Sequence, residues 1–267
     1  MLNTSITIGQ YIPGDSILHR ADPRTKIILS IAFMVMTFLV NSFWTFAALT
    51  IFTLIVVLIS GVPMKYTLKG LKPLLFIIIF TAVVNIFTTN GTPISQTVPL
   101  KYITYEGIEL ALKLAVRLAL IIISGSLLTF TTTPILLTDG IEKLLNPLKK
   151  IGVPAHELAM MMSIALRFIP TLLEETDKIM KAQAARGADF DTGNLVQRAK
   201  SFIPVLVPLF VSAFRRADEL ATAMEARCYR GGTGRTRMRQ LKLTEADIKV
   251  WVTSVVFFTG LLLLEYL

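Results

Sequence analysis

Two short segments of the chain share a pattern of alanines and one arginine at the ends of predicted helices. Residues 177–186 and 218–227 both follow the pattern D-x4-A-x2-A-R, and the second copy begins 41 residues after the first. Alanine keeps a helix thin enough to enter a groove, and an arginine in the last turn suits the negative end of the helix dipole. The guanidinium also presents five donors in a fixed fork that matches a carboxylate on a partner.

A repeated pair of such helix ends is more informative than a single one. One arginine near a helix C-terminus is common for the dipole reason alone. Here a breaker-rich stretch follows each copy, so each would form an exposed helix tip. Two similar tips favour two similar sockets, such as a pair of related partner subunits would supply. We therefore expect the following partner-binding residues: Ala185, Arg186, Gly187, Ala226, Arg227 and Cys228.

The two tips belong to residues 139–249, a segment that is rich in charge and yet laced with apolar residues. It holds 18 of the 27 basic residues and 13 acidic residues. The pattern predicts three long amphipathic helices over residues 135–150, 154–186 and 194–227, with Gly187 as the cap of the second. Internal prolines should bend the second and third of these helices. They are Pro170, Pro204 and Pro208.

The composition of the chain is that of a membrane protein. Of its 267 residues, 53% are hydrophobic and 17% are charged, with a mean hydropathy of +0.64. Soluble domains carry about 25% charged residues, and a membrane-spanning helix needs about 20 mostly apolar residues. We therefore expect an all-α, polytopic membrane protein. Five apolar runs could supply its spans: residues 27–40, 43–59, 74–87, 118–138 (in a helix that begins near Gly107) and 250–264.

The placement of lysine and arginine predicts which loops face the cytoplasm. Basic residues cluster before the first run, between the second and third runs, and in residues 139–249, whereas residues 41–42 and 88–105 hold only Lys101. Five crossings would then leave the C-terminus outside the cell, unless part of residues 139–249 also crosses. The formal net charge of +9 fits this bias better than it fits nucleic-acid binding. We expect the lipid bilayer as a partner and no nucleic acid.

Residue types that support catalysis or metal binding are scarce in this chain. Cys228 is the one cysteine, and the two histidines, His19 and His156, are 137 residues apart, so we expect no metal site. The sequence contains no phosphate-binding loop of the form G-x-x-x-x-G-K-[ST]. We therefore expect no catalytic residue, no cofactor bound by this chain and no ATP hydrolysis by it.

The second long helix carries two further groups, each with two possible roles. Its three consecutive methionines, Met160, Met161 and Met162, offer an adaptable surface to a partner or fill a core between helices. Its acidic group either pairs with two arginines of the third long helix or faces solvent. The acidic residues are Glu174, Glu175 and Asp177, and the arginines are Arg215 and Arg216.

Charged residues near the predicted spans favour interfacial positions. Glu109 and Lys113 lie four residues apart near the start of the fourth run, with Arg117 four residues further. This spacing is typical of a helix end at the interface, where lysine and arginine snorkel toward water. A basic run near the C-terminal span most simply lies at the anionic inner leaflet. It consists of Arg230, Arg235, Arg237, Arg239 and Lys242.

Three features together resemble a known family over nearly the whole chain. They are Asp-Pro-Arg-Thr-Lys at residues 22–26, Thr133-Pro134 before a predicted helix, and the two motifs that end at Gly187 and Cys228. They are similar to EcfT, the transmembrane coupling subunit of energy-coupling factor (ECF) transporters. The resemblance implies an L-shaped helical protein in the plasma membrane of a prokaryote. It also implies that Arg186 and Arg227 dock into grooves on two ATP-binding cassette subunits.

The same resemblance implies the remaining partners and the ligands that they hold. One or several substrate-binding membrane subunits, the S-components, would contact the methionines Met160, Met161 and Met162. ATP and its Mg²⁺ would be bound by the cassette subunits, and the transported substrates would be vitamins or metal ions. In the family both termini are usually cytoplasmic, which differs from the count of five crossings. The second motif also ends in Cys228 rather than in glycine.

These inferences predict a division of the chain and a function. We expect membrane-embedded helices over residues 1–133, a coupling domain of three long amphipathic helices over 134–248, and a C-terminal transmembrane helix over 249–267. The implied function is that of a non-catalytic subunit that transmits ATP-driven motion to an S-component. The alternatives are a membrane scaffold and a stand-alone secondary transporter. A secondary transporter needs ionisable groups deep in its spans, and the first, second, third and fifth runs contain none.

Overall fold

The described part of the chain is built from helices arranged in two compact units. The computed structural model describes residues 11–92, 104–190, 192, 194–232 and 241–266, and these contain no β-strand. Residues 11–140 and 241–266 contribute to the first unit, and residues 141–232 contribute to the second. We call them the membrane unit and the motif unit. The predicted class, an all-α polytopic membrane protein, is confirmed by this helical content and by five helices long and apolar enough to cross a membrane.

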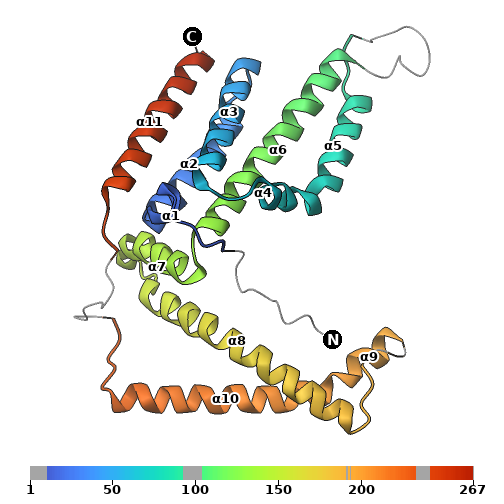
Figure 1. The fold of residues 1–267 in the computed structure, drawn as a ribbon, viewed down its shortest axis with the longest axis vertical. Coiled ribbons are helices and arrows are strands. Elements are labelled where there is room, and N and C mark those ends of the chain that lie inside the picture. The colour runs from blue at the N-terminus through green and yellow to red at the C-terminus, as the bar shows by residue number, and fades with distance from the viewer. Residues whose placement is uncertain (1–10, 93–103, 191, 193, 233–240, 267) are drawn as a thin grey trace. The chain divides into compact units, whose positions relative to one another are not determined.

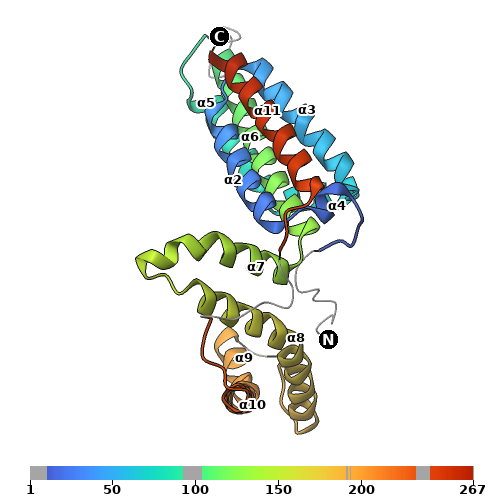
Figure 2. The same ribbon diagram turned by 90° about the vertical axis from the view of Figure 1, so that its left-hand side faces the viewer.

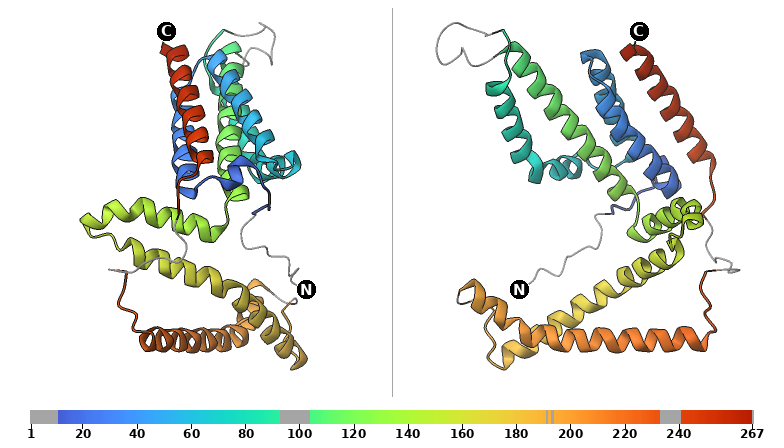
Figure 3. Two further views of the ribbon diagram at one scale, coloured as in Figure 1. Left: turned by 60° about the vertical axis from the view of Figure 1, so that its left-hand side comes forward. Right: turned by 180° about the vertical axis from the view of Figure 1, so that it is seen from behind.

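The membrane unit is a bundle whose long helices lie side by side (Figures 1 and 2). Figure 3 shows α5 and α6 adjacent in both views, and they form the most extensive helix pair of the unit. The helices are α1 (Ile17–Arg20), α2 (Pro23–Leu39), α3 (Phe43–Ser60), α4 (Met64–Leu71), η1 (Lys72–Leu74), α5 (Leu75–Thr88), α6 (Tyr105–Thr131) and α11 (Glu245–Tyr266), together with the first part of α7 (Pro134–Leu145).

Local sequence explains where these helices begin and end. Asp22 caps α2 through a 2.9 Å hydrogen bond from the backbone N–H of Arg24, and Pro23 occupies the first helical position. Gly61, at φ 70°, ends α3 in the left-handed conformation that glycine adopts most easily. The predicted uncharged run over residues 118–138 is not one helix. It breaks after Thr131, and Pro134 starts α7, because proline cannot continue a helix but suits its first turn.

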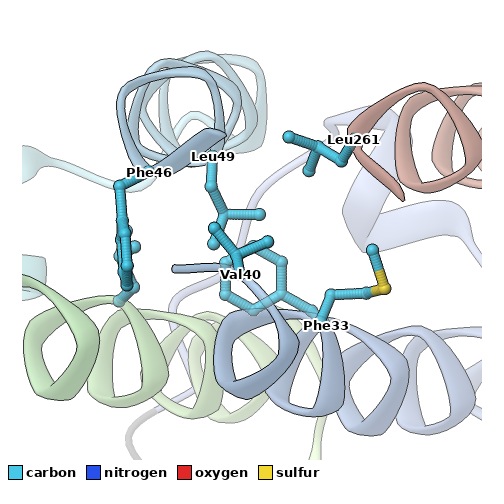
Figure 4. Packing of buried hydrophobic residues seen from close by; sticks show 7 residues of the cluster. Phe33, Val40, Phe46, Leu49 and Leu261 are labelled. Carbon is cyan, nitrogen blue, oxygen red and sulfur yellow. The ribbon is translucent and has the colours of Figure 1, made fainter. Parts of the chain in front are cut away.

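A cluster of apolar side chains from four helices forms the core of the membrane unit (Figure 4). Its members are Phe33 and Met36 of α2, Val40 at the C-cap of α2, Phe46 and Leu49 of α3, Leu120 of α6 and Leu261 of α11. Beside it, the rings of Phe52 and Phe257 stack with their centroids 4.0 Å apart. Other large apolar side chains point outward, such as Leu58 and Phe76, which are 70% and 76% exposed. A bilayer solvates such a surface, whereas water would not.

Most of the helices that could span a membrane overlap the predicted apolar runs. The first predicted run is missing from these candidates, and one helix from residues 139–249 is added to them. By length and composition, the candidates are α3, the segment Met64–Thr88, α6, α8 (Ala155–Ala185) and α11. The first predicted run corresponds to α2, which has 17 residues and is therefore about 25 Å long. It packs against α6 and α11 inside the membrane unit. The remaining candidate, α8, lies in residues 139–249, for which the sequence left a further crossing open, and it belongs to the motif unit.

Two carboxylates of α11, one near each end of the helix, accept hydrogen bonds from groups near the two ends of α2. At the start of α11, Asp247 is 1% exposed and accepts a 2.6 Å hydrogen bond from the backbone N–H of Asp22. At its end, Glu265 accepts hydrogen bonds from the backbone N–H of Asn41 (3.0 Å) and from the hydroxyl of Thr45 (2.7 Å). Since Asp22 precedes α2 and Asn41 follows it, α11 runs parallel to α2 and ends at the α2–α3 turn.

This direction bears on the side of the C-terminus. The start of α2 and the C-terminal end of α11 lie at opposite ends of the membrane unit, as the count of five crossings requires. The expectation of two cytoplasmic termini, which came from the family resemblance, does not agree with this arrangement. Basic residues gather at the end that holds Asp22 and Asp247, which the positive-inside rule assigns to the cytoplasm. They are Arg20, Arg24, Lys26 and Lys249.

Arg117 does more than reach toward the interface, which is the role that the sequence predicted. Its guanidinium donates to the carbonyl oxygens of Thr37 (3.0 Å) and Val40 (2.8 Å) at the end of α2. It also lies 5.7 Å and 5.3 Å from the ring centroids of Phe38 and Phe46. Arg117 therefore satisfies carbonyl groups that the last turn of α2 leaves unpaired. The predicted pair between Glu109 and Lys113 is present at 2.6 Å.

The Asp-Pro-Arg segment at the start of α2 forms a closed polar cluster. The guanidinium of Arg24 lies 2.8 Å from the carboxylate of Asp22 and donates a 3.4 Å hydrogen bond to the carbonyl of Leu241. Burial raises the pKa of Asp22, but the hydrogen bonds and the charge of Arg24 outweigh it, so the pKa lies below its usual value. The resulting stabilisation is present above the ordinary aspartate pKa and is lost as the pH falls through the lowered value.

We predict that the C-terminus faces the exterior. Alkaline phosphatase fused after Leu267 should be active and green fluorescent protein at the same place dark, because α11 ends opposite the basic end of the unit. The control places the same reporters in the α3–α4 turn at Gly61, where the opposite result is expected. A fluorescent C-terminal fusion would show that α11 does not cross in this direction.

We predict that Asp247→Ala destabilises the membrane unit by about 1–3 kcal/mol, because it leaves buried N–H groups without an acceptor. Besides the N–H of Asp22, this carboxylate accepts from the N–H (2.7 Å) and the hydroxyl (2.8 Å) of Thr244. Unfolding of the purified chain in detergent measures the effect. Glu245→Ala, at the exposed first position of the same helix, should change stability by less than about 0.5 kcal/mol. Equal effects of the two variants would contradict the capping role.

Candidate partner-docking site

The motif unit is built around two long helices that carry the two predicted tips. It contains the end of α7, η3 (Asn146–Ile151), α8, α9 (Leu195–Ser201) and α10 (Ile203–Ala226). The first predicted long helix ends at Leu145 and continues as the 3-10 turn η3. The third, expected over residues 194–227, is two helices that meet at Phe202. Pro204 lies in the first turn of α10, where its ring and missing N–H prevent an unbroken helix.

One polar cluster joins α8 to α10. Glu175 of α8 lies 2.7 Å from the guanidinium of Arg216 and accepts a 2.5 Å hydrogen bond from the hydroxyl of Ser212. The sequence left open whether the acidic group of α8 pairs with arginines of the other helix, and for Glu175 it does. The neighbouring charges pair within their own helices: Asp177 with Lys181 at 2.6 Å, and Arg215 with Glu219 at 3.9 Å.

The two tips have nearly the same backbone conformation. Arg186 is the C-cap of α8 with φ −91° and ψ 8°, and Arg227 is the C-cap of α10 with φ −92° and ψ 13°. The next residue is left-handed in both cases, with φ 89° at Gly187 and φ 55° at Cys228. Cys228 is the one residue other than glycine with a positive φ in the described part of the chain. The sequence placed Gly187 at the cap, whereas the structure puts it one residue beyond.

Matching hydrogen bonds close both tips. At the first tip, Gly187 N–H donates to Ala184 O (2.9 Å) and Ala188 N–H donates to Gln183 O (3.0 Å). At the second tip, the N–H groups of residues 228 and 229 donate to the carbonyl oxygens of residues 225 (2.8 Å) and 224 (3.1 Å). Both sets form a Schellman motif, which satisfies the last carbonyl groups of a helix from within the chain. The sequence repeat is therefore a repeat of backbone structure, despite the cysteine in the second copy.

All six predicted docking residues are exposed. Within the described residues, the guanidinium groups of Arg186 and Arg227 make no hydrogen bond or ion pair, and only the backbone N–H groups of these residues are bonded, to the carbonyl oxygens of Gln183 and Met224. Since the Schellman motif already satisfies the helix ends, the two guanidinium groups are not needed to cap them. Their donors are available to a partner.

The second tip also borders a cavity of about 640 Å³ between α8 and α10. Its apolar lining includes Met160, Ile164 and Met224, and the residues Arg167, Arg227 and Arg230 line it as well. The three consecutive methionines therefore lie in different surroundings. Met160 faces this cavity, whereas Met161 and Met162 are exposed on α8, at 54% and 47%.

The sequence did not predict the partners of His156. Its Nδ1 lies 3.1 Å from the carboxylate of Glu142, which is buried on α7, and its Nε2 lies 3.3 Å from the hydroxyl of Tyr229. These residues are 14 and 73 positions away in the sequence, so no local spacing brings them together. His156 thus joins α7, α8 and the segment after α10.

The described residues contain no cluster of histidine, cysteine and carboxylate side chains that could hold a metal ion. The one cysteine, Cys228, is exposed at the second tip. Of the predicted basic run, Arg230 and Lys242 are described, whereas Arg235, Arg237 and Arg239 lie outside the described residues.

Apolar helices of spanning length, together with two helix ends that share one backbone motif and an arginine C-cap, define a multi-pass membrane protein with a repeated surface motif. The chain belongs to the CbiQ family, described as cobalt transport protein, which matches residues 14–238. This finding confirms the family resemblance and the localisation in a prokaryotic membrane.

Several relatives share the name energy-coupling factor transporter transmembrane protein EcfT. The protein from Ruminiclostridium cellulolyticum is 64% identical over 261 residues, which cover 98% of this chain and 97% of the relative. The protein from Thermosediminibacter oceani is 56% identical over 262 residues, with 98% of both chains covered. The protein from Bacillus subtilis is 51% identical over 252 residues, with 94% and 95% covered. The similarity therefore extends over both units.

The left-handed residue at each tip leads to a prediction of opposite effects. Gly187→Ala should destabilise the last turn of α8 by about 1 kcal/mol, because a Cβ is unfavourable at positive φ. Cys228→Gly should stabilise the last turn of α10 by up to about 1 kcal/mol for the same reason. Hydrogen exchange of peptides that cover the two turns measures both effects.

A glycine in an ordinary helical position provides the control for this prediction. At Gly260 in α11, an added Cβ meets no atom within 4 Å, so Gly260→Ala should be neutral or stabilising. Slower exchange in Gly187→Ala, or faster exchange in Cys228→Gly, would contradict the cap geometry described for the tips.

Proposed function

We propose that this chain is the transmembrane coupling subunit of an ECF-type importer. In this role it transmits the ATP-driven motion of two ATP-binding cassette subunits to a substrate-binding S-component. The uptake of vitamins or metal ions follows from that motion. The observation that carries the proposal is the pair of arginine-capped tips with the same backbone, Arg186 and Arg227. The name that the relatives share supports the same class of protein.

The docking step follows from the geometry of the tips. Ala185 and Ala226 keep each helix end thin, and the exposed arginine that follows offers a fork of donors to a carboxylate in a groove. Two tips of one shape require two sockets of one shape, which two related cassette subunits supply. In this proposal ATP and Mg²⁺ bind to those subunits, and the chain acts as a non-catalytic subunit beside them.

Transmission requires that the two tips do not move independently. The cluster of Glu175, Ser212 and Arg216 joins the shafts of α8 and α10, so a displacement of one tip is passed to the other helix. Residues 134–248 act as the coupling domain in this proposal, between the membrane-embedded helices of 1–133 and the C-terminal span of 249–267. The exposed Met161 and Met162 on α8 form the contact for the S-component, with Met160 behind them.

The alternative of a stand-alone secondary transporter lacks support in the membrane unit. Such a transporter needs ionisable groups that line a path through the spans. In the described residues of this unit, the ionisable groups near the helix ends have structural partners. They include Asp22, Arg24, Lys113, Arg117, Asp247 and Glu265.

We predict that Arg186→Glu and Arg227→Glu each abolish ATP-driven uptake and weaken the binding of the cassette subunits by at least about 30-fold. The reversed charge would face a carboxylate of the socket, and like charges placed together cost several kcal/mol. Arg215→Glu is the matched control, because Arg215 is an exposed arginine of α10 that lies away from both tips, 3.9 Å from Glu219. Uptake retained in both tip variants would refute docking through these residues.

The partners can be identified directly from the native host. When the tagged full-length chain is purified in mild detergent, two ATP-binding cassette subunits and one or more small hydrophobic proteins should co-purify with it. Mass spectrometry identifies these proteins. Reconstitution of that complex in vesicles should give ATP-dependent uptake. A complex without uptake would favour the scaffold, and a chain that is purified alone and still transports would favour the secondary transporter.

A further inference from the structure

A chain of hydrogen-bonding groups connects the second tip to α7. Tyr229 lies two residues after Arg227, and its hydroxyl is 3.3 Å from Nε2 of His156. The other ring nitrogen of His156 is 3.1 Å from a carboxylate oxygen of Glu142. In the tautomer of His156 that carries its proton on Nδ1, Nδ1 donates to the carboxylate and Nε2 accepts a hydrogen bond from the hydroxyl of Tyr229. The three side chains thus link α7, the first turns of α8 and the segment that follows α10.

The segment after the second tip also packs closely on the histidine ring. A Cβ at Gly232 would overlap ring carbons of His156, so only a glycine lets the backbone pass at this distance. Between these contacts, residues 227–231 form one wall of the 640 Å³ cavity between α8 and α10. The second tip is therefore held by both a polar contact and a steric contact with His156. We call Glu142, His156, Tyr229 and Gly232 the tip anchor.

The first tip is held differently, although its backbone is the same. Gln183, just before it, donates a 3.4 Å hydrogen bond to the carbonyl of Pro204 in α10. Phe190, just after it, packs on Phe202 with ring centroids 5.3 Å apart and accepts a 3.4 Å hydrogen bond from Arg198. These contacts lead to α9 and the start of α10, and among the described residues none leads to α7.

The two tips contact different elements, and these contacts determine which element moves when a tip is displaced. Helix α7 begins at Pro134, and α6 of the membrane unit ends at Thr131, so only two residues separate them. A displacement of the second tip through the anchor therefore reaches the helix that continues into the membrane unit. The first tip lies at the opposite end of α8 from His156, and its own contacts are with α9 and the start of α10.

We propose that Glu142, His156 and Tyr229 are positioning residues that lock the second tip to α7, so that the two docking arginines are not equivalent. The anchor fixes the position of Arg227 directly, whereas Arg186 lies at the far end of α8 and is positioned by contacts with α9 and the start of α10. This inference rests on the proposed function for its consequence in transport. The anchor itself is a property of the isolated chain and can be tested without any partner.

The single cysteine of the chain provides a probe at the second tip. A nitroxide spin label on the exposed Cys228 of the purified full-length chain reports the mobility of that tip by electron paramagnetic resonance. We expect Tyr229→Phe, His156→Ala and Glu142→Ala each to raise the mobile fraction of the spectrum at least about twofold. Glu142→Gln keeps an acceptor for His156 and should restore the spectrum of the unmodified chain, which a general loss of packing would not allow.

Two controls separate loosening of the anchor from loss of the fold. Tyr66→Phe removes the hydroxyl of an exposed tyrosine in α4 and should leave the Cys228 spectrum unchanged. A label on Ala188→Cys in a Cys228→Ser chain reports the first tip, and the anchor variants should not change it. An unchanged spectrum at Cys228, or equal mobility gains at both tips, would overturn the anchor.

A double-mutant cycle on the complex with the cassette subunits tests the consequence for docking. Tyr229→Phe should weaken binding about three- to tenfold, as the loss of one positioning hydrogen bond predicts. It should have no further effect on top of Arg227→Ala, and its full effect on top of Arg186→Ala. Additive effects in both pairs would overturn the difference between the tips. If neither arginine variant alters binding, the proposed docking fails, while the label experiment still decides whether the anchor exists.

Discussion

The structure depends on one constraint: the backbone groups at helix ends must find partners away from water. Each helix leaves several N–H and C=O groups unpaired at its ends. In the membrane unit, side chains from distant parts of the sequence supply these partners. Asp247 and Glu265 accept from backbone N–H groups before α2 and α3, and Arg117 donates to the carbonyl groups that end α2. These contacts set the neighbours of α11 and its direction.

In the motif unit, the same constraint is met within the chain, and that difference has a functional consequence. The Schellman motifs at both tips satisfy the last carbonyl groups of α8 and α10 by backbone hydrogen bonds. The guanidinium groups of the two C-cap arginines are therefore not needed to satisfy the helix ends. They remain exposed, in contrast to the guanidinium group of Arg117. An arginine that a helix end does not need is free to bind a carboxylate elsewhere, which is the property that docking requires.

The two tips show how one backbone motif can serve two mechanical roles. Their dihedral angles and hydrogen bonds agree closely, so a partner meets the same shape twice. The contacts behind the tips differ, because α10 begins beside the first and α7 lies behind the second through His156. Glu175 connects the two shafts. Equal recognition by two sockets is thus compatible with unequal connections to the rest of the chain.

Local patterns in the sequence were enough for the helical class, for most of the apolar spans and for the repeated tips. Hydrophobic runs, glycine and proline act over a few residues, and a repeat is visible wherever it lies. Those patterns do not predict contacts between residues that are far apart in the sequence. The pairing of Asp22 with Asp247, of Asn41 with Glu265 and of Glu142 with His156 and Tyr229 depends on helices meeting in space. The split at Phe202 was missed because the amphipathic pattern continued through Pro204. Only the tertiary structure decided the direction of α11 and the anchor of the second tip, since each depends on side chains that no sequence period connects.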